Sequence, residues 1–269
     1  MIPNISIAFM TVSAVTCIGL PIFIFIYWRK KYELKVIPLL VGVAAFVVFA
    51  VYLQLVLNVL VLNPSEDGTV ALLDKSPWLF VIYTIFARAI IEETGRFAAF
   101  KILSGKYTNI GTALSFGIGY CGFLTFFVGF AMVSDIYVCS LINSGDTAAL
   151  SESMNLQAFI LTIQGKEPAV FLIEGIERLI AMAAHISLSI IVLCSATKKG
   201  MVWLYPVAIA LHAAVNLAPT MFRVGFFESI WLVELLSLLP VALCAAAAYK
   251  VCMFMGEAST PVSLEIETI

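Results

Sequence analysis

The sequence carries very little charge for its length. Of its 269 residues, only 12% are Asp, Glu, Lys or Arg, whereas 62% are hydrophobic, and the mean hydropathy is +1.06. An average soluble domain has about 25% charged residues, and so few charges cannot cover a surface that faces water. This scarcity excludes a soluble globular fold, and the high hydrophobicity excludes an intrinsically disordered chain. A multi-pass membrane protein is the class that remains.

Several motifs are also absent. No stretch interleaves basic residues with aromatics, so we expect no nucleic-acid binding. The six cysteines form no CxxC pair and mostly lie in apolar runs, where cysteine acts as a small hydrophobe. No HExxH motif is present. Gly117–Gly122 matches GxGxxG literally, but it lies in an apolar run with no preceding strand, so we expect close helix packing there and no dinucleotide site.

The apolar residues fall into seven runs that are long enough to cross a bilayer, which takes about 20 residues. We therefore predict an all-α fold, a polytopic transmembrane helix bundle of about seven spans that lies in the cell membrane and contacts the lipid bilayer. Residues 1–256 would form one transmembrane domain, and residues 257–269 would form a short polar cytosolic tail. The predicted spans lie near residues 5–28, 36–62, 78–100, 110–134, 169–196, 201–222 and 229–250.

The distribution of basic residues predicts the orientation. The first run has no charge before it and ends at Arg29–Lys31, which is the reverse of the order in a signal peptide. Connecting segments predicted to lie inside hold nine Lys and Arg residues, and those predicted to lie outside hold three. The positive-inside rule therefore predicts an N-terminus outside, a C-terminus inside and a long external loop over 135–167, with a turn at Asn143–Gly145.

Ionisable residues within the spans concentrate in the third, fifth and sixth, although each one costs about 2.5–3.5 kcal/mol at the centre of a membrane helix. At 1.5 Å per residue, Glu92 lies about 14 Å from Lys101. His185 and His212 each lie about 20 Å from the nearest cytosolic lysine. In a hydrocarbon core about 30 Å thick, all three fall in the middle third, which predicts that they share one site.

Spacing within each helix refines this prediction. Arg88, Glu92 and Arg96 form an i, i+4, i+8 row in which opposite charges can neutralise each other. Glu93 points about 100° away from Glu92, which would leave it as the freer base. His212 and Asn216 are four residues apart and share a face. Glu177 and Arg178 lie some 30 Å above Lys198, near the outer interface, and we interpret them as a structural pair.

Each of these residues also has a plainer interpretation. The Glu–Arg row could be an ion pair that fixes helix packing, and a lone intramembrane histidine is more often a hydrogen-bonded packing residue than a ligand. The coincidence of depth favours a functional site. One glutamate and two histidines suit hydrolysis, because the histidines can hold a divalent ion such as zinc while the carboxylate takes a proton from water. Asn216 could hydrogen-bond the developing oxyanion or complete a metal shell.

These residues resemble the CAAX-protease and bacteriocin-processing superfamily, which carries EExxxR, FxxxH and HxxxN/D blocks. The EExxR spacing from Glu92 to Arg96 and the number of spans resemble more closely its YhfC-type branch of intramembrane metalloproteases, over residues 85–220. The resemblance implies that Glu92 activates water, that Arg96 belongs to the catalytic block, that His185 and His212 bind metal or the reacting carbonyl, and that Asn216 assists.

Two departures from the superfamily pattern keep the choice of base open. The arginine comes one residue early, so Glu92 and not Glu93 has an arginine at i+4, and Ala181 stands where the FxxxH block has phenylalanine. Both Glu92 and Glu93 therefore stay in the predicted site.

The function that we predict from these residues is that of an intramembrane endopeptidase acting on a membrane protein or peptide. Two alternatives stay open. A transporter could use the same buried Glu and His groups to relay protons or bind ions, although the sequence shows no inverted repeat. A catalytically silent scaffold would tolerate the loss of both histidines.

Overall fold

The computed structural model describes residues 1–65, 69–146, 150 and 155–257, and within these residues it contains helices and no strand. The predicted all-α fold is thus confirmed. The elements are α1 (Asn4–Lys31), α2 (Val36–Ala45), the π-helix η1 (Phe46–Leu53), α3 (Gln54–Leu62), α4 (Ala71–Lys75), α5 (Pro77–Leu103), α6 (Ile110–Ser144), α7 (Leu156–Gln164), α8 (Pro168–Thr197), α9 (Leu204–Arg223) and α10 (Ile230–Glu257).

In the described residues, six helices are long and apolar enough to cross a membrane. They are α1, the continuous run of α2, η1 and α3, and helices α6, α8, α9 and α10. The other predicted span, 78–100, lies in α5, whose 27 residues are sufficient in length. Helix α5 does not belong to the apolar set because it carries four charges between Arg88 and Arg96. The chain is a multi-pass integral membrane protein.

The largest departure from the predicted boundaries is in α6. Asn109 caps its N-terminus by accepting a hydrogen bond from the Thr112 amide at 3.0 Å. The helix then continues ten residues beyond the predicted end, to Ser144, and Gly145 ends it in the left-handed conformation with φ 81°. The first part of the predicted 135–167 loop is therefore helix. Of the predicted 257–269 tail, Glu257 is the last residue of α10, and the remainder lies outside the described residues.

Helix α8 is the centre of the bundle. It contacts α1, α5, α6, α9 and α10, and it is the most buried of the six apolar helices. Helix α6 packs beside α8 through glycines that face different neighbours. Gly117 lies against Ile186 of α8, and Gly119 lies against the backbone of Leu39 in α2. These contacts confirm the expectation that the glycines of the GxGxxG match allow close helix packing.

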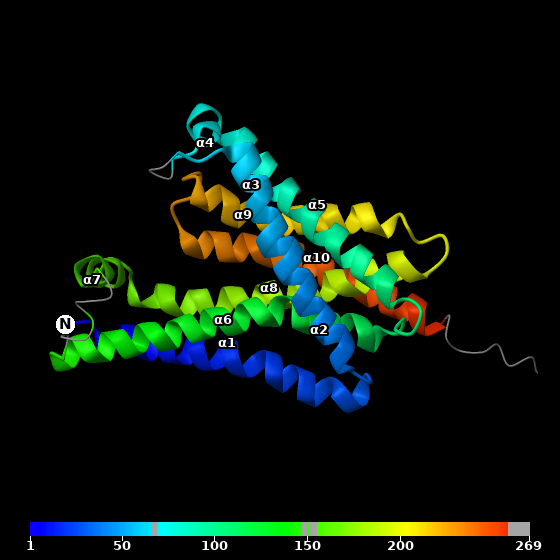
Figure 1. Ribbon diagram of the computed structural model, residues 1–269, viewed down its shortest axis with the longest axis horizontal. Coiled ribbons are helices and arrows are strands. Elements are labelled where there is room, and N and C mark those ends of the chain that lie inside the picture. Colours follow the sequence, from blue (N-terminus) through cyan, green and yellow to red (C-terminus); the bar gives the residue numbers. More distant parts are fainter. Residues whose placement is uncertain (66–68, 147–149, 151–154, 258–269) are drawn as a thin grey trace, which may run out of the picture.

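The connections between helices gather at two ends of the bundle (Figure 1). The α5–α6 and α8–α9 connections and the C-terminal end of α10 lie at one end, and the N-terminus, α7 and the α9–α10 connection lie at the other. This arrangement has the alternation that the basic residues predict. Which end faces the cytosol stays a prediction from the positive-inside rule.

Candidate active site

Helix α5 supplies both candidate carboxylates and pairs each with an arginine. Arg88 Nε donates to Glu92 Oε1 at 2.8 Å, four residues apart, and Arg96 Nη1 donates to Glu93 Oε1, three residues apart. Both glutamates and Arg96 are at most 1% exposed. The expectation that Glu93 is the freer base is wrong, because Arg96 pairs with Glu93 and leaves Glu92 to Arg88.

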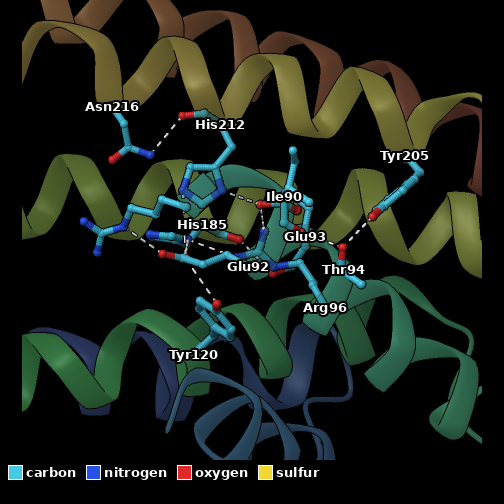
Figure 2. Close-up of polar contacts among 12 residues, drawn as sticks. Ile90, Glu92, Glu93, Thr94, Arg96, Tyr120, His185, Tyr205, His212 and Asn216 are labelled. Carbon is cyan, nitrogen blue, oxygen red and sulfur yellow. Dashed lines mark hydrogen bonds and ion pairs between the residues drawn. The ribbon is translucent and has the colours of Figure 1, made fainter. Parts of the chain in front are cut away.

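Glu92 lies where four helices meet (Figure 2). The Tyr120 hydroxyl of α6 donates to its Oε2 at 3.1 Å. The same oxygen is 3.8 Å from His212 Nε2 of α9 and 4.0 Å from His185 Nδ1 of α8. One side-chain donor atom from each of Glu92, His185 and His212 lies within 4.8 Å of the other two. The structure thus brings together the three residues that the depth count placed at one level.

The proton positions on His212 follow from its contact with Glu93. The His212 Nδ1 and Glu93 Oε1 atoms are 2.6 Å apart, and His212 is 2% exposed. Arg96, which can only donate, also contacts Glu93 Oε1, so this oxygen acts as an acceptor. His212 Nδ1 therefore donates, and in the neutral ring Nε2 keeps a lone pair on the side of Glu92. A carboxylate behind an imidazole is the usual way to orient a metal-binding histidine.

His185 has the opposite arrangement. Its Nδ1 lies 3.0 Å from Arg96 Nη2, and since arginine can only donate, Nδ1 accepts. In the neutral ring, the proton is then on Nε2. The rings of His185 and His212 stand edge to face at 5.2 Å, and the Arg96 guanidinium lies 4.6 Å over the ring of Tyr120. Arg96 therefore holds Glu93, His185 and Tyr120 in place together.

The donors present fit a divalent metal ion. Two imidazoles and one carboxylate are a ligand set of catalytic zinc sites, in which a further position stays open for water or substrate. Two buried atoms in the group, Glu93 Oε2 and Arg96 Nε, have no hydrogen-bond partner among the described residues. Such atoms are uncommon in protein interiors and often mark the place of a water or an ion. An ion bound at His185 Nδ1 would replace the hydrogen bond from Arg96.

Asn216 lies one helical turn from His212 and has no contact with the carboxylates. Its Nδ2 donates to the His212 carbonyl at 3.1 Å, so the amide is fixed on its own helix. Asn216 lines the same cavity as both histidines. The predicted site residue is thus beside the Glu/His/His group, in the wall of the cavity that both histidines line.

The cavity has a volume of about 410 Å³ and is lined by residues of α5, α6, α8, α9 and α10. This volume is within the range of about 300–1,000 Å³ of small-molecule sites. Glu177 and Arg178 form the predicted ion pair at 3.5 Å, but both line this cavity together with Glu234. The sequence could not reveal this, because the depth count contains no information on which helices are neighbours. The charged residues of the cavity wall are Arg88, Glu177, Arg178, Arg223 and Glu234.

Fold and site together define a class: a multi-pass membrane protein in which three helices bring one carboxylate and two histidines together beside a cavity. The profile of the YhfC intramembrane metalloprotease family matches residues 16–237, and the chain belongs to that family. The "Uncharacterized membrane protein YhfC" of Bacillus subtilis (strain 168) is 27% identical over 248 residues, which cover 90% of this chain and 95% of that protein. No solved structure matches the chain. The predicted resemblance to the YhfC branch is confirmed.

Proposed function

We propose that the protein is an intramembrane metalloprotease that hydrolyses a peptide bond of a membrane-associated protein or peptide. The observation that carries this proposal is the convergence of Glu92, His185 and His212 within the membrane-spanning bundle, where the two histidines line a cavity and the buried Glu92 lies directly behind them. The family name supports the same class of reaction. A structural ion pair alone would not need two histidines on two further helices.

Glu92 is the residue that we propose as the base. Arg88 and Tyr120 fix its two oxygens, so the carboxylate is oriented toward both imidazoles without a change of rotamer. A water held between Glu92 and the imidazoles would lose its proton to Glu92 as it attacks the carbonyl. Glu93 is assigned a different role, because its contact with His212 Nδ1 directs Nε2 of that ring into the site.

A divalent ion, zinc by the kind of donors, would be held by His185 and His212, with Glu92 beside it as the base. When bound, such an ion polarises the substrate carbonyl and makes a bound water a better nucleophile. Asn216 Nδ2 has a second hydrogen that its bond to the His212 carbonyl does not use. That hydrogen can stabilise the oxyanion of a substrate in the cavity.

The test is a metal analysis of the purified protein combined with a cleavage screen of apolar peptides. We expect about one zinc per chain, cleavage that stops with chelation and returns with zinc, and neither metal nor cleavage in His185→Ala and His212→Ala. A Glu92/Glu93 double alanine variant should bind less metal and cleave nothing. Ser237→Ala is the matched control, because Ser237 also lines the cavity but its hydroxyl donates a hydrogen bond to the Val233 carbonyl of its own helix.

Both histidine variants should keep a melting temperature close to that of the wild type. A buried polar cluster kept for function costs stability, since its groups were withdrawn from water. A purely structural cluster predicts the reverse, variants that unfold and whose folded fraction is fully active. Full activity of a folded His185→Ala protein would end the protease proposal.

A further inference from the structure

Arg88 is only partly used by the contacts described so far. Its Nε donates to Glu92 Oε1, whereas Nη1 and Nη2 have no hydrogen-bond partner among the described residues. Its side chain is 41% exposed, although the Glu92 side chain that it binds is 1% exposed. Arg88 is also one of the residues that line the 410 Å³ cavity. Two guanidinium nitrogens are thus free to bind a molecule that enters the cavity.

Neither of the two other arginines in the spans is comparable. Arg96 is fully buried and uses both Nη atoms, on Glu93 and His185. Arg178 is paired with Glu177. An arginine within a membrane helix is costly, and it usually has a partner or faces a pathway for a charged molecule. The Nη1 and Nη2 atoms of Arg88, which form the edge of its guanidinium away from Glu92, therefore indicate a place for a ligand.

We propose that Arg88 binds a carboxylate of the substrate and so sets the specificity of the site. The inference rests on the proposed function, in which a peptide occupies this cavity. The planar guanidinium edge binds a carboxylate through two hydrogen bonds. The carboxylate is either the C-terminus of the peptide or an Asp or Glu side chain. We commit to a carboxylate because the proposed substrate is a peptide, and the acidic groups of an unmodified peptide are carboxylates.

The position of Arg88 limits where this carboxylate lies in the substrate. The Nη atoms are two bonds from Nε, which is 2.8 Å from Glu92. One extended residue spans about 3.3–3.6 Å, so a carboxylate on the Nη atoms lies within about two residues of the bond that Glu92-activated water attacks. The site should therefore prefer substrates with a negative charge one or two residues from the scissile bond.

The experiment measures binding to the full-length protein in detergent, with chelator present so that nothing is cleaved. Three fluorescein-labelled apolar hexapeptides are compared by anisotropy: one with a free C-terminal carboxylate, the same peptide amidated, and an amidated peptide with a penultimate Glu. A hydrogen bond between charged groups is worth about 1.5–3 kcal/mol, so at least one carboxylate peptide should bind about 10–100-fold tighter than the neutral amide. Which peptide gains identifies the source of the carboxylate.

Variants of Arg88 distinguish its proposed binding of the substrate carboxylate from its ion pair with Glu92. Arg88→Gln should bind all three peptides equally, and Arg88→Lys should keep the charge but lose most of the preference. Arg223→Gln removes another cavity arginine, 11 residues or roughly 16 Å beyond His212 along α9, and should keep it. Equal or absent binding of all three peptides by the wild type, or a preference that survives in Arg88→Gln, would overturn the proposal. Carboxylate-selective binding without cleavage by zinc-loaded protein would instead refute only the protease function.

Discussion

The residues of the site are organised around Arg96, a group that need not touch the substrate. It forms an ion pair with Glu93 and donates a hydrogen bond to His185 Nδ1. Its guanidinium also lies over the ring of Tyr120, whose hydroxyl donates to Glu92. One buried guanidinium is thereby connected to both imidazoles, to His185 directly and to His212 through Glu93. The protein places a fixed charge where a soluble enzyme could rely on ordered water.

Substitution of Asn216 tests whether this residue assists peptide cleavage without being essential for it. Asn216→Ala should lower kcat/KM of peptide cleavage about 10²–10³-fold, the usual cost of one oxyanion donor, and leave measurable activity. Because its described hydrogen bonds stay within α9, the melting temperature should hardly change. Cleavage kinetics with purified protein check this, with Ser237→Ala as the control. Wild-type rates in Asn216→Ala would remove Asn216 from the site.

Much of the residue-scale result was predictable from spacing. Counting from the cytosolic lysines placed Glu92, His185 and His212 at one depth, and the structure has them in contact. Residue spacing could not show which glutamate pairs with Arg96, because Glu93 and Glu92 lie three and four residues before it and both are within reach. The position of the Arg96 side chain also involves His185 of another helix, which spacing along α5 does not show. The role that we propose for Arg88 could not be predicted for the same reason, since it depends on a cavity that residues of five helices line.

At the scale of elements, close contacts between backbones hold the support of the site in place. A Cβ on Gly119 of α6 would collide with the Leu39 carbonyl of α2, and a Cβ on Gly42 of α2 would collide with the Phe116 carbonyl. Tyr120, which donates to Glu92, directly follows Gly119 on α6. Helix association in membranes depends on such small residues, because lipid supplies no hydrophobic driving force between helices.

Gly119→Ala should therefore destabilise the protein by about 1–3 kcal/mol, the usual cost of overpacking. Gly19→Ala in α1 is the matched control, because a Cβ there meets nothing within 4 Å, and its effect should stay within the helix-propensity difference of about 1 kcal/mol. Thermal unfolding in detergent measures both. Equal melting temperatures for the two variants would contradict the packing described for α2 and α6.

The sequence predicted these elements to within a few residues because long apolar runs mark spans directly. The end of α6 was not predicted, because residues 135–144 continue the helix beyond its most apolar part. The helix ends at Ser144, and Gly145 follows in the left-handed conformation. Helix α5 is a helix of the bundle that an apolar run alone would not identify. Its charges keep it out of the apolar set, yet its length and its contacts with α8 and α9 place it in the bundle.

At the scale of the whole molecule, the cavity extends from the histidines toward one end only. Its wall along α9 continues from His212 to Arg223, and along α10 it lies over the N-terminal part, Ile230 to Ser237. These segments belong to the end that carries the N-terminus and the α9–α10 connection (Figure 1). If the positive-inside prediction holds, this end faces outside, and substrates reach the site from that side of the membrane.

Cysteine labelling in intact cells tests this direction of access. In a background without the six native cysteines, Phe222→Cys on the cavity wall should react with a membrane-impermeant maleimide added outside. Lys106→Cys, exposed on the α5–α6 connection at the opposite end, should react only after permeabilisation. A bulky maleimide at residue 222 should also slow peptide cleavage, because it narrows the cavity that Phe222 lines. Labelling of residue 222 from the cytosol alone would reverse both the predicted topology and the direction from which substrates enter.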